Sequence, residues 1–203
     1  HGGNFKAWYE SRSFLMRMYV RMVLRRVSYV AVLGESFRRL FNGLIASNRV
    51  AVVPNGIDWP AVHKPAREQH KPNRHRILHL STLNRLKGAP ILMAAIPMVL
   101  KVRHDVEFIF AGPWSHEEDQ REAESFIAHH GLDDHIVFTG SVNTVEHKRS
   151  IYSSADLFVF PGIQQEGQPL VVLEAMASEL PILFTDRGCL RDTVIEGECG
   201  LEV

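Results

Sequence analysis

The sequence has little cysteine, no long apolar run and no net charge. Its 203 residues contain two cysteines, Cys189 and Cys199, which are too few for a disulfide scaffold and lack the spacing of a metal site. A reducing cytoplasm is therefore the expected environment. No signal peptide is visible, and no apolar run reaches the ~20 residues that a membrane span needs. The apolar content of 45% is that of an ordinary globular chain with enough material for a core.

The zero net charge hides a marked asymmetry along the chain. Residues 1–50 carry nine Lys or Arg against two Asp or Glu, whereas residues 101–203 carry seven against nineteen. The acidic second half argues against a nucleic-acid partner. The basic first part is suited to an anionic acceptor or a membrane surface.

A helix is expected over residues 6–27, with basic residues along one side and apolar residues along another. The basic set is Arg17, Arg21 and Arg25, and the apolar set is Met16, Val20, Val23 and Val27. One interpretation is a helix that contacts anionic lipid at the inner face of a membrane. The other is a domain helix with a solvated basic face, which is favoured because apolar residues surround much of the helix.

Alternating strand and helix patterns predict an α/β fold with two parts. In residues 1–58 we expect a strand at 29–33, a helix at 35–45 and a strand at 49–53. Residues 59–75 lack periodicity and predict a linker. From residue 76 we expect strands at 77–81, 106–111, 136–139, 157–160 and 181–185, with helices at 89–102, 117–130, 146–154 and 169–178. This order predicts a Rossmann-like, doubly wound parallel sheet over 76–203, preceded by a partial second α/β domain.

We expect the chain to be a fragment cut at both ends. It lacks an initiating Met, and its last four residues have the pattern of a strand. Ligands of doubly wound sheets bind beyond the carboxyl ends of the strands. The loops that follow the strands, at 82–88, 112–116, 140–146 and 161–168, are therefore where a site is expected.

The stretch 160–177, FPGIQQEGQPLVVLEAMA, combines the features of a phosphate site. A buried strand leads into a loop with Gly162 and Gly167, and a helix follows from about Pro169. Amides at a helix N-terminus and the helix dipole favour an anion at such a place. Glu166 in the loop and Glu174 in the helix bracket the site, about two helical turns apart.

Glu166-x7-Glu174, within EGQPLVVLEAMA, resembles the E-x7-E motif of retaining glycosyltransferases, family four in particular, which have the GT-B fold. The resemblance implies that Glu166 lies beside the transferred sugar and that Glu174 holds the ribose hydroxyls of the nucleotide. It also implies that amides between them, at Gly167, Leu170 and Val171, bind the diphosphate. A solvated glutamate on an amphipathic helix is the alternative.

The segment 81–88, STLNRLKG, is similar to the family's G-R-L-x-x-x-K-G, in which the Arg and the Lys contact the donor diphosphate. Lys87 matches, whereas Ser81 stands where the family has Gly and Thr82 where it has Arg. Arg85 is a candidate for the missing charge, although a loop Arg is commonly solvated. If neither Thr82 nor Arg85 compensates, donor affinity or turnover should be lower.

Two further segments resemble the family. Residues 137–142 match V-x-F-x-G-x-V, and the loop that contains Val142 would hold the nucleotide base. His1, followed by two glycines, resembles a His that contacts the donor sugar across the cleft, and a structural or solvated His is the alternative. The other His residues form no cluster with ligand spacing, so no protein-bound metal or other cofactor is expected.

The resemblance implies transfer of a sugar from a nucleotide-diphosphate donor to a hydroxyl of a glycan or lipid-linked acceptor, with retention of configuration. A glycoside hydrolase would need both carboxylates at one glycosidic bond. A P-loop would need Lys where Gln168 follows Gly167. A non-catalytic nucleotide-sugar-binding module is the remaining alternative, given Thr82. Neither the base, the sugar nor the acceptor follows from the sequence.

Overall fold

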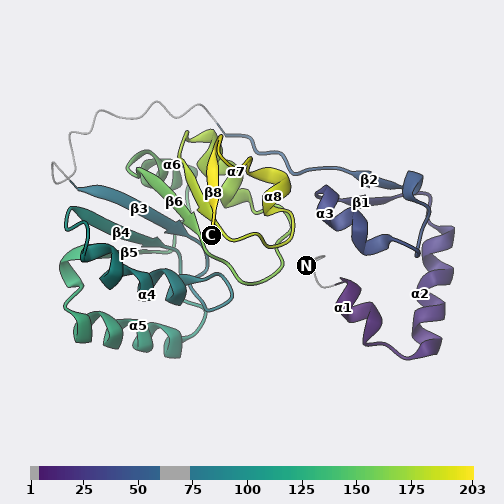
Figure 1. Cartoon of the computed structure of the whole chain (residues 1–203), viewed down its shortest axis with the longest axis horizontal. Coiled ribbons are helices and arrows are strands. Elements are labelled where there is room, and N and C mark those ends of the chain that lie inside the picture. Colours follow the sequence, from purple (N-terminus) through teal and green to yellow (C-terminus); the bar gives the residue numbers. More distant parts are fainter. Residues whose placement is uncertain (1–4, 60–73) are drawn as a thin grey trace.

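Six parallel strands form the main sheet of this computed structural model, which describes residues 5–59 and 74–203 (Figure 1). Residues 74–203 contain β3 (His75–Leu80), α4 (Ala89–Leu100), β4 (Val106–Ala111), α5 (Glu117–His130), η4 (Asp133–His135), β5 (Ile136–Gly140), α6 (Val145–Ser153), β6 (Leu157–Phe160), α7 (Leu170–Ala177), β7 (Ile182–Phe184), α8 (Leu190–Thr193) and β8 (Gly200–Glu202). The strand–helix alternation expected over 76–203 is confirmed.

The order of strands across the sheet is β5-β4-β3-β6-β7-β8, and every neighbouring pair is parallel. From β3 the chain first moves outward to β4 and β5, then returns to the other side of β3 and continues through β6 to β8. The order reverses between β3 and β6. In open α/β sheets, ligands bind beyond the carboxyl ends of the strands at such a reversal. The loops after β3 and β6 are therefore the ones that the topology selects.

Helices cover both faces of the sheet, as a parallel sheet requires. One core cluster packs α6 and α7 against residues such as Leu78, Phe158 and Phe184. The other packs α4 and α5 against residues such as Phe108 and Phe110. All six residues of β4 are buried, because this strand lies inside the sheet with helices on both faces. These two clusters hold the sheet rigidly behind the loops at its carboxyl end.

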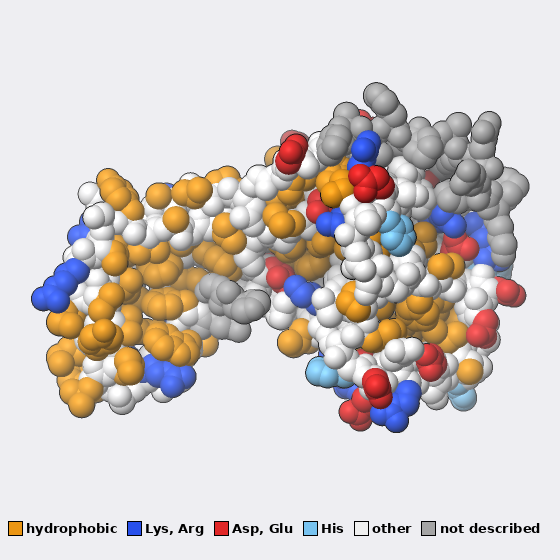
Figure 2. All heavy atoms as spheres, turned by 180° about the vertical axis from the view of Figure 1, so that it is seen from behind, with side chains coloured by type: hydrophobic (Ala, Val, Ile, Leu, Met, Phe, Trp, Pro, Cys, Tyr) orange, Lys and Arg blue, Asp and Glu red, His pale blue; other side chains and the backbone are white. Residues whose placement is uncertain are grey.

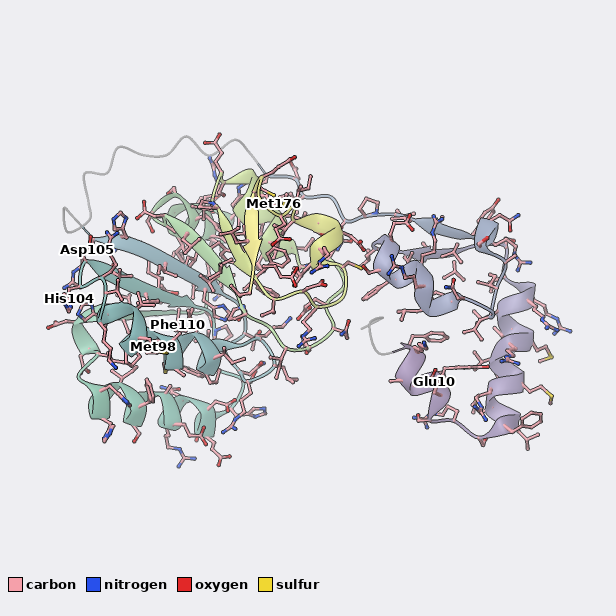
Figure 3. The ribbon with its side chains drawn as sticks, in the orientation of Figure 1. Glu10, Met98, His104, Asp105, Phe110 and Met176 are labelled. Atoms are coloured by element: carbon pink, nitrogen blue, oxygen red, sulfur yellow. The ribbon has the colours of Figure 1, made fainter. Side chains whose placement is uncertain are left out.

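The carboxyl ends of the strands face the N-terminal part of the chain. His104 and Asp105, which directly precede β4, lie at the end of the sheet that points away from that part (Figure 3). The loops after the strands therefore lie between the sheet and residues 5–58, which is where a two-domain enzyme would place its cleft.

Residues 5–58 form a smaller lobe around a two-stranded parallel sheet. They contain α1 (Phe5–Glu10), α2 (Phe14–Arg26), β1 (Val30–Val32), α3 (Glu35–Arg38), the 3₁₀ turns η2 (Arg39–Phe41) and η3 (Ser47–Arg49), and β2 (Val50–Val52). A small core joins Val32, Phe37 and Val50 to Cys189, which comes from the larger lobe. Most of the predicted linker, 60–73, lies outside the described residues.

The prediction of a single helix over 6–27 is wrong, because the structure has two helices in this segment, α1 and α2. The chain turns at Ser11–Ser13, and the Ser13 hydroxyl accepts a hydrogen bond from the Met16 amide as an N-cap of α2. Ser commonly begins a helix in this way, and the apolar periodicity on both sides concealed the break. The helix expected over 35–45 is also shorter, since α3 passes into η2 and Gly43, at φ 74°, reverses the chain.

Candidate functional site

The loop after β6 delivers Glu166 to the carboxyl end of the sheet. Pro169 is the N-cap of α7, so the helix begins at Leu170, one residue later than the sequence suggested, and the Pro169 carbonyl accepts from the Val172 amide. Gly167 lies against Leu33 of the smaller lobe, where an added Cβ would come within 2.7 Å of the leucine side chain. The loop therefore packs against the smaller lobe, and a side chain at Gly167 would require the Leu33 side chain to move.

Lys87 and Glu166 meet at this point, although they are 79 residues apart. Lys87 Nζ lies 2.6 Å from Glu166 Oε1, and the Gln164 amide donates to the same oxygen at 2.5 Å. Lys87 Nζ also lies 5.9 Å from the centre of the Phe160 ring. The loops after β3 and β6 are thus joined by a cation and a carboxylate, the two groups that the sequence assigned to the diphosphate and the sugar.

Two glycines permit this close approach of loops. Gly88 has φ 85°, and a Cβ there would lie 2.1 Å from the Pro161 carbonyl oxygen. Gly188 has φ 72°, and a Cβ there would lie 1.8 Å from the carbonyl oxygen of Glu166. That carbonyl accepts from the Cys189 amide at 3.1 Å. The segment 185–188, TDRG, is similar to a family loop near the donor or the domain interface, and the contact of Gly188 with Glu166 is what the sequence did not predict.

Glu174 is buried in α7, and both of its oxygens have partners. Lys148 of α6 lies 2.8 Å from Oε1, and the Tyr152 hydroxyl lies 3.1 Å from Oε2 and 2.8 Å from the Val171 carbonyl. Burial and the charge of Glu174 raise the pKa of Tyr152 well above its usual value, so the hydroxyl keeps its proton. Sequence reasoning missed Lys148 and Tyr152. Their i, i+4 spacing on one predicted helix was the available signal.

His79 supports the Lys87 loop from beneath. It is fully buried in β3, its Nδ1 lies 3.0 Å from the Val159 carbonyl, and its Nε2 lies 2.8 Å from Ser81 Oγ. Burial lowers the pKa of His79 to about 4, and Lys87 contributes in the same direction. The ring is therefore neutral near pH 7, with Nδ1–H donating to the carbonyl and Nε2 accepting from the Ser81 hydroxyl. Ser81, which departs from the family's Gly, has this ring as its partner.

Arg85 points away from Lys87 and Glu166. Its guanidinium lies 2.6 Å from Glu122 and 3.6 Å from Asp119, both on α5, and its side chain is 67% exposed. Thr82 is exposed at the start of the loop. Lys87 is therefore the cation that this loop brings to Glu166, and Arg85 is directed to the opposite side.

The remaining predicted donor residues lie around the same end of the sheet. Val142 packs against the core cluster that contains α6 and α7, Leu170 is exposed at the start of α7, and Val171 is partly buried behind it. His1 lies outside the described residues.

The N-terminal part of the chain contacts the larger lobe around the site through hydrogen bonds. Asn55 makes two hydrogen bonds to Gln168. The Asn55 backbone N–H donates to Gln168 Oε1 at 2.5 Å, and the Asn55 side-chain amide donates to the Gln168 backbone carbonyl at 2.9 Å. The Ser36 amide donates to Asp192 Oδ2 at 2.8 Å. Trp59 donates to Ser178 Oγ at 3.1 Å and meets Tyr152 edge-on. Through Asn55, the segment 54–58 thus contacts the loop that carries Glu166.

A cavity of about 390 Å³ lies between the lobes beside Glu166. Its lining residues are Phe5, Ala31, Val32, Leu33, Phe37, Leu40, Phe41, Glu166, Gly167, Gln168 and Pro169. The smaller lobe supplies the apolar side and the loop before α7 supplies the polar side, so the cavity opens onto the carboxylate that was assigned to the sugar.

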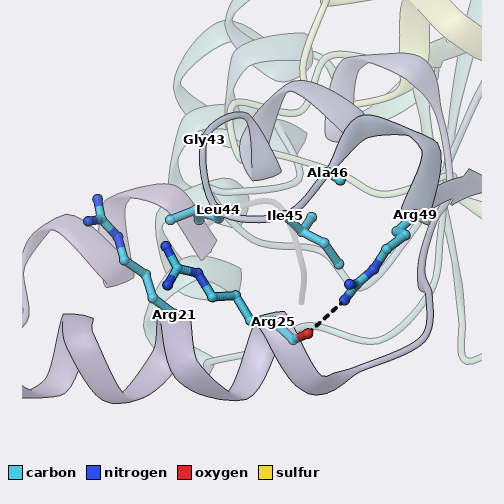
Figure 4. Close-up of a pocket in the computed structure, with 7 residues that line it drawn as sticks. All are labelled: Arg21, Arg25, Gly43, Leu44, Ile45, Ala46 and Arg49. Carbon is cyan, nitrogen blue, oxygen red and sulfur yellow. Dashed lines mark hydrogen bonds between the residues drawn. The ribbon is translucent and has the colours of Figure 1, made fainter.

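The outer face of the smaller lobe is both apolar and basic. No residue of α2 is buried, and hydrophobic side chains gather over this part of the surface (Figure 2). A second cavity of about 370 Å³ contains Arg21, Arg25 and Arg49 (Figure 4). Arg49 donates to the carbonyls of Arg25 and Leu24 at the end of α2, which ties the helix to η3.

Within residues 5–59 and 74–203, no group of three or more His, Cys, Asp or Glu side chains is arranged to hold a metal ion. Among the helices of this described part, none has the length and apolarity to cross a bilayer.

Comparison with known proteins gives a consistent family. Residues 74–203 match the family described as "Glycosyl transferases group 1". The chain is 28% identical over 172 residues to spore coat protein SA of Bacillus subtilis, covering 76% of this chain and 45% of that protein. It is 25% identical over 188 residues to the phosphatidyl-myo-inositol mannosyltransferase of Mycolicibacterium smegmatis, covering 92% and 46%. The chain thus spans about half the length of these relatives.

Solved structures show the same fold at low sequence identity. Sucrose-phosphate synthase from Thermosynechococcus elongatus superposes with a TM-score of 0.78 at 22% identity, over 100% of this chain and 53% of the enzyme. The Anabaena protein Alr3699/HepE, in complex with UDP and glucose, has a TM-score of 0.73 at 20% identity, over 96% and 54%. The chain belongs to the group 1 glycosyl transferases, and it has the Rossmann-like architecture of their GT-B fold.

Proposed function

We propose that this chain carries the donor half of a retaining glycosyltransferase that uses a nucleotide-diphosphate sugar. The observation that carries the proposal is the placement of Glu166 and Glu174 on either side of the α7 N-terminus, next to the point where the strand order reverses. Each carboxylate is paired with a lysine from a different loop or helix. Such an arrangement provides acceptors for sugar and ribose hydroxyls and cations for a diphosphate.

The diphosphate would lie at the start of α7, close to Lys87 and the amides of Gly167, Leu170 and Val171. A helix N-terminus stabilises an anion by about 0.3–2 kcal/mol, whereas micromolar affinity requires roughly 8 kcal/mol. Lys87, the contact of Glu174 with ribose, and burial of the base beside Val142 must therefore supply most of the binding. Lys87 and the amides would also balance the charge of the leaving diphosphate, with no protein-bound metal.

In the proposed reaction, the bond from the anomeric carbon to the diphosphate oxygen breaks, a bond to the acceptor oxygen forms, and the proton of the acceptor hydroxyl passes to the leaving diphosphate. Retention follows either from attack on the face that the diphosphate leaves or from a carboxylate nucleophile. We assign Glu166 to positioning the sugar and stabilising charge at the anomeric centre. A non-catalytic nucleotide-sugar-binding module is the alternative, favoured by Thr82 where the family has Arg.

The acceptor is proposed to be a glycan or a lipid-linked hydroxyl, polysaccharide precursors included. Three features support it: the apolar cavity beside Glu166, the basic α2, and relatives named as mannosyltransferases for phosphatidyl-myo-inositol. We further propose that the protein works in the cytoplasm and contacts the inner membrane face through α2. Sedimentation with vesicles of 30% phosphatidylglycerol would test this, with neutral phosphatidylcholine vesicles as the control. Binding to neither kind would refute the membrane contact.

Binding of UDP, GDP, ADP and dTDP, measured by ligand-observed NMR, tests the donor site. We expect one nucleotide to bind selectively to the wild-type chain, and we expect this binding to be lost in the Glu174→Ala variant. Glu166→Ala should keep the bare nucleotide but fail to turn over the matching nucleotide sugar in the whole protein. A folded chain that binds none of the four would contradict the donor site, and binding without transfer or hydrolysis by the whole protein would favour the non-catalytic module.

A further inference from the structure

Lys148 is a partly buried cation to which the resemblance assigns no role. It is the fourth residue of α6, whose first turn is capped by the Thr144 hydroxyl accepting from the His147 amide. The helix follows directly on the loop that carries Val142. From there Lys148 reaches across to α7 and places Nζ 2.8 Å from Glu174 Oε1. The side chain therefore links the proposed base loop to the proposed ribose carboxylate.

The hydrogen-bonding capacity of this pair is only partly used. A carboxylate has about four acceptor positions, and in Glu174 the ammonium of Lys148 and the hydroxyl of Tyr152 take one each. An ammonium has three N–H donors, and Glu174 takes one of them. Two acceptor positions on Glu174 and two donors on Lys148 thus remain for a ligand.

A vicinal diol has donors and acceptors that match the unused positions of Glu174 and Lys148. Each hydroxyl donates one hydrogen and accepts through its oxygen, whereas an ionised carboxylate can only accept. Glu174 alone would bind the hydrogens and leave the hydroxyl oxygens without donors from the protein. Lys148 supplies those donors. Its side chain is 27% exposed against 8% for Glu174, so an incoming ligand meets the lysine first.

We propose that Lys148 is a specificity-determining residue that reads the ribose hydroxyls together with Glu174 and so selects ribonucleotide over 2′-deoxyribonucleotide donors. The inference rests on the proposed function, which places the ribose at Glu174. A missing 2′-hydroxyl leaves one N–H of Lys148 and one acceptor position of the buried Glu174 unfilled. Hydrogen bonds to charged groups of this kind correspond to a roughly 10- to 100-fold preference for the ribonucleotide.

The competing explanation is that the pair only ties α6 to α7. Arg76 and Glu107 provide a matched comparison, since they lie 2.8 Å apart with side chains 20% and 10% exposed. They join the first half of β3 to β4, near the amino ends of the strands and away from the loops that bind ligand. Removing Arg76 therefore removes a similar ion pair without touching the proposed site.

The test measures affinities of UDP, 2′-deoxy-UDP, GDP and 2′-deoxy-GDP for the wild-type chain and the variants K148M, K148R and R76M. We expect the wild type to prefer the ribo form of the nucleotide that it binds. K148M should bring the ratio of the two affinities close to one, at least about threefold below the wild-type ratio. K148R should keep most of the preference because it retains charge and donors, and R76M should keep all of it.

Each alternative outcome is decisive. If folded K148M keeps the wild-type ratio, the inference is wrong, while continued ribonucleotide binding leaves the proposed function standing. If K148M weakens both forms equally, Lys148 acts only through structure or charge, and the inference again fails. If the wild type binds neither these nucleotides nor ADP and dTDP, the proposed function fails and the inference with it. Should K148M not fold, K148A, which likewise has neither donors nor charge, takes its place with the same criteria.

Discussion

Lys87 Nζ and Glu166 Oε1 lie 2.6 Å apart, so the cation proposed for the diphosphate and the carboxylate proposed for the sugar are already in contact. A bound diphosphate would compete with Glu166 for the ammonium. Charge-assisted hydrogen bonds of this type are the strong ones, and Gln164 supplies Glu166 with an additional donor. The pair therefore holds the two loops together until a donor enters.

This contact predicts opposite results for its two members. Lys87→Met should lower the affinity for the nucleoside diphosphate without its sugar by roughly 10- to 100-fold, because a charged donor to phosphate is lost. Glu166→Gln should leave that affinity unchanged or raise it, because it frees Lys87, yet turnover of the nucleotide sugar by the whole protein should fall. Calorimetric titration together with a transfer assay separates the two effects. Equal losses of nucleotide affinity in both variants would contradict the assigned roles.

Glu174→Gln should weaken nucleotide binding directly. The amide keeps the shape of the side chain but replaces one acceptor oxygen with a donor, which faces the ammonium of Lys148 or the hydroxyl of Tyr152. We expect roughly a tenfold or greater loss of affinity, in line with removal of hydrogen bonds to a charged group. Titration of the nucleotide measures the loss, and Glu107→Gln, in the partly buried Arg76–Glu107 pair, is the control that should bind normally.

Much of this architecture could be predicted from the sequence because its signals are local. The buried runs of β4 and β6 and the Pro169 helix start are encoded within a few residues. Lys148 and Tyr152 could not be assigned to Glu174, because their contact depends on how α6 crosses the sheet to lie beside α7. The same holds for Arg85, whose partners on α5 are 34 and 37 residues away along the chain. Ion pairs between residues far apart in the sequence depend on how the helices pack around the sheet. Local sequence patterns do not specify that packing.

Gly188→Ala should destabilise the protein more than a comparable change elsewhere. Its Cβ would lie 1.8 Å from the Glu166 carbonyl oxygen, and that backbone cannot shift without moving the loop. Gly131→Ala is the matched control, since Gly131 also has a positive φ of 62° but no atom within 4 Å of the added Cβ. Strain alone should cost about 1–2 kcal/mol at Gly131, and the clash should add to it at Gly188. Urea unfolding measures both, and equal losses would show that the Glu166 loop is pliable.

Arg85→Ala should leave nucleotide affinity within about twofold of wild type, because its exposed ion pairs with Glu122 and Asp119 are worth about 0–1 kcal/mol and lie away from Lys87. This separates the two candidates for the second positive charge in the 81–88 loop. A tenfold loss of affinity in the same titration would mean that Arg85 leaves α5 when the donor binds and takes the place of the family's Arg. The loss of affinity in Lys87→Met, measured in parallel, shows how large the effect of losing a phosphate-binding cation is.

His79 should make the protein sensitive to acid. Its pKa is about 4 in the folded chain against 6.5 for an unperturbed imidazole, so between these values the unfolded chain binds a proton that the folded chain does not. The free energy of unfolding should therefore be fully retained above pH 6.5 and fall by about 3 kcal/mol as the pH decreases to 4. His79→Phe removes this titration and should reduce the loss over that range by the same amount, whatever its own stability at pH 7. Urea unfolding of both proteins at pH 7, 5.5 and 4.5 measures the difference, and parallel pH dependences would show that the ring is protonated or reached by water in the folded protein.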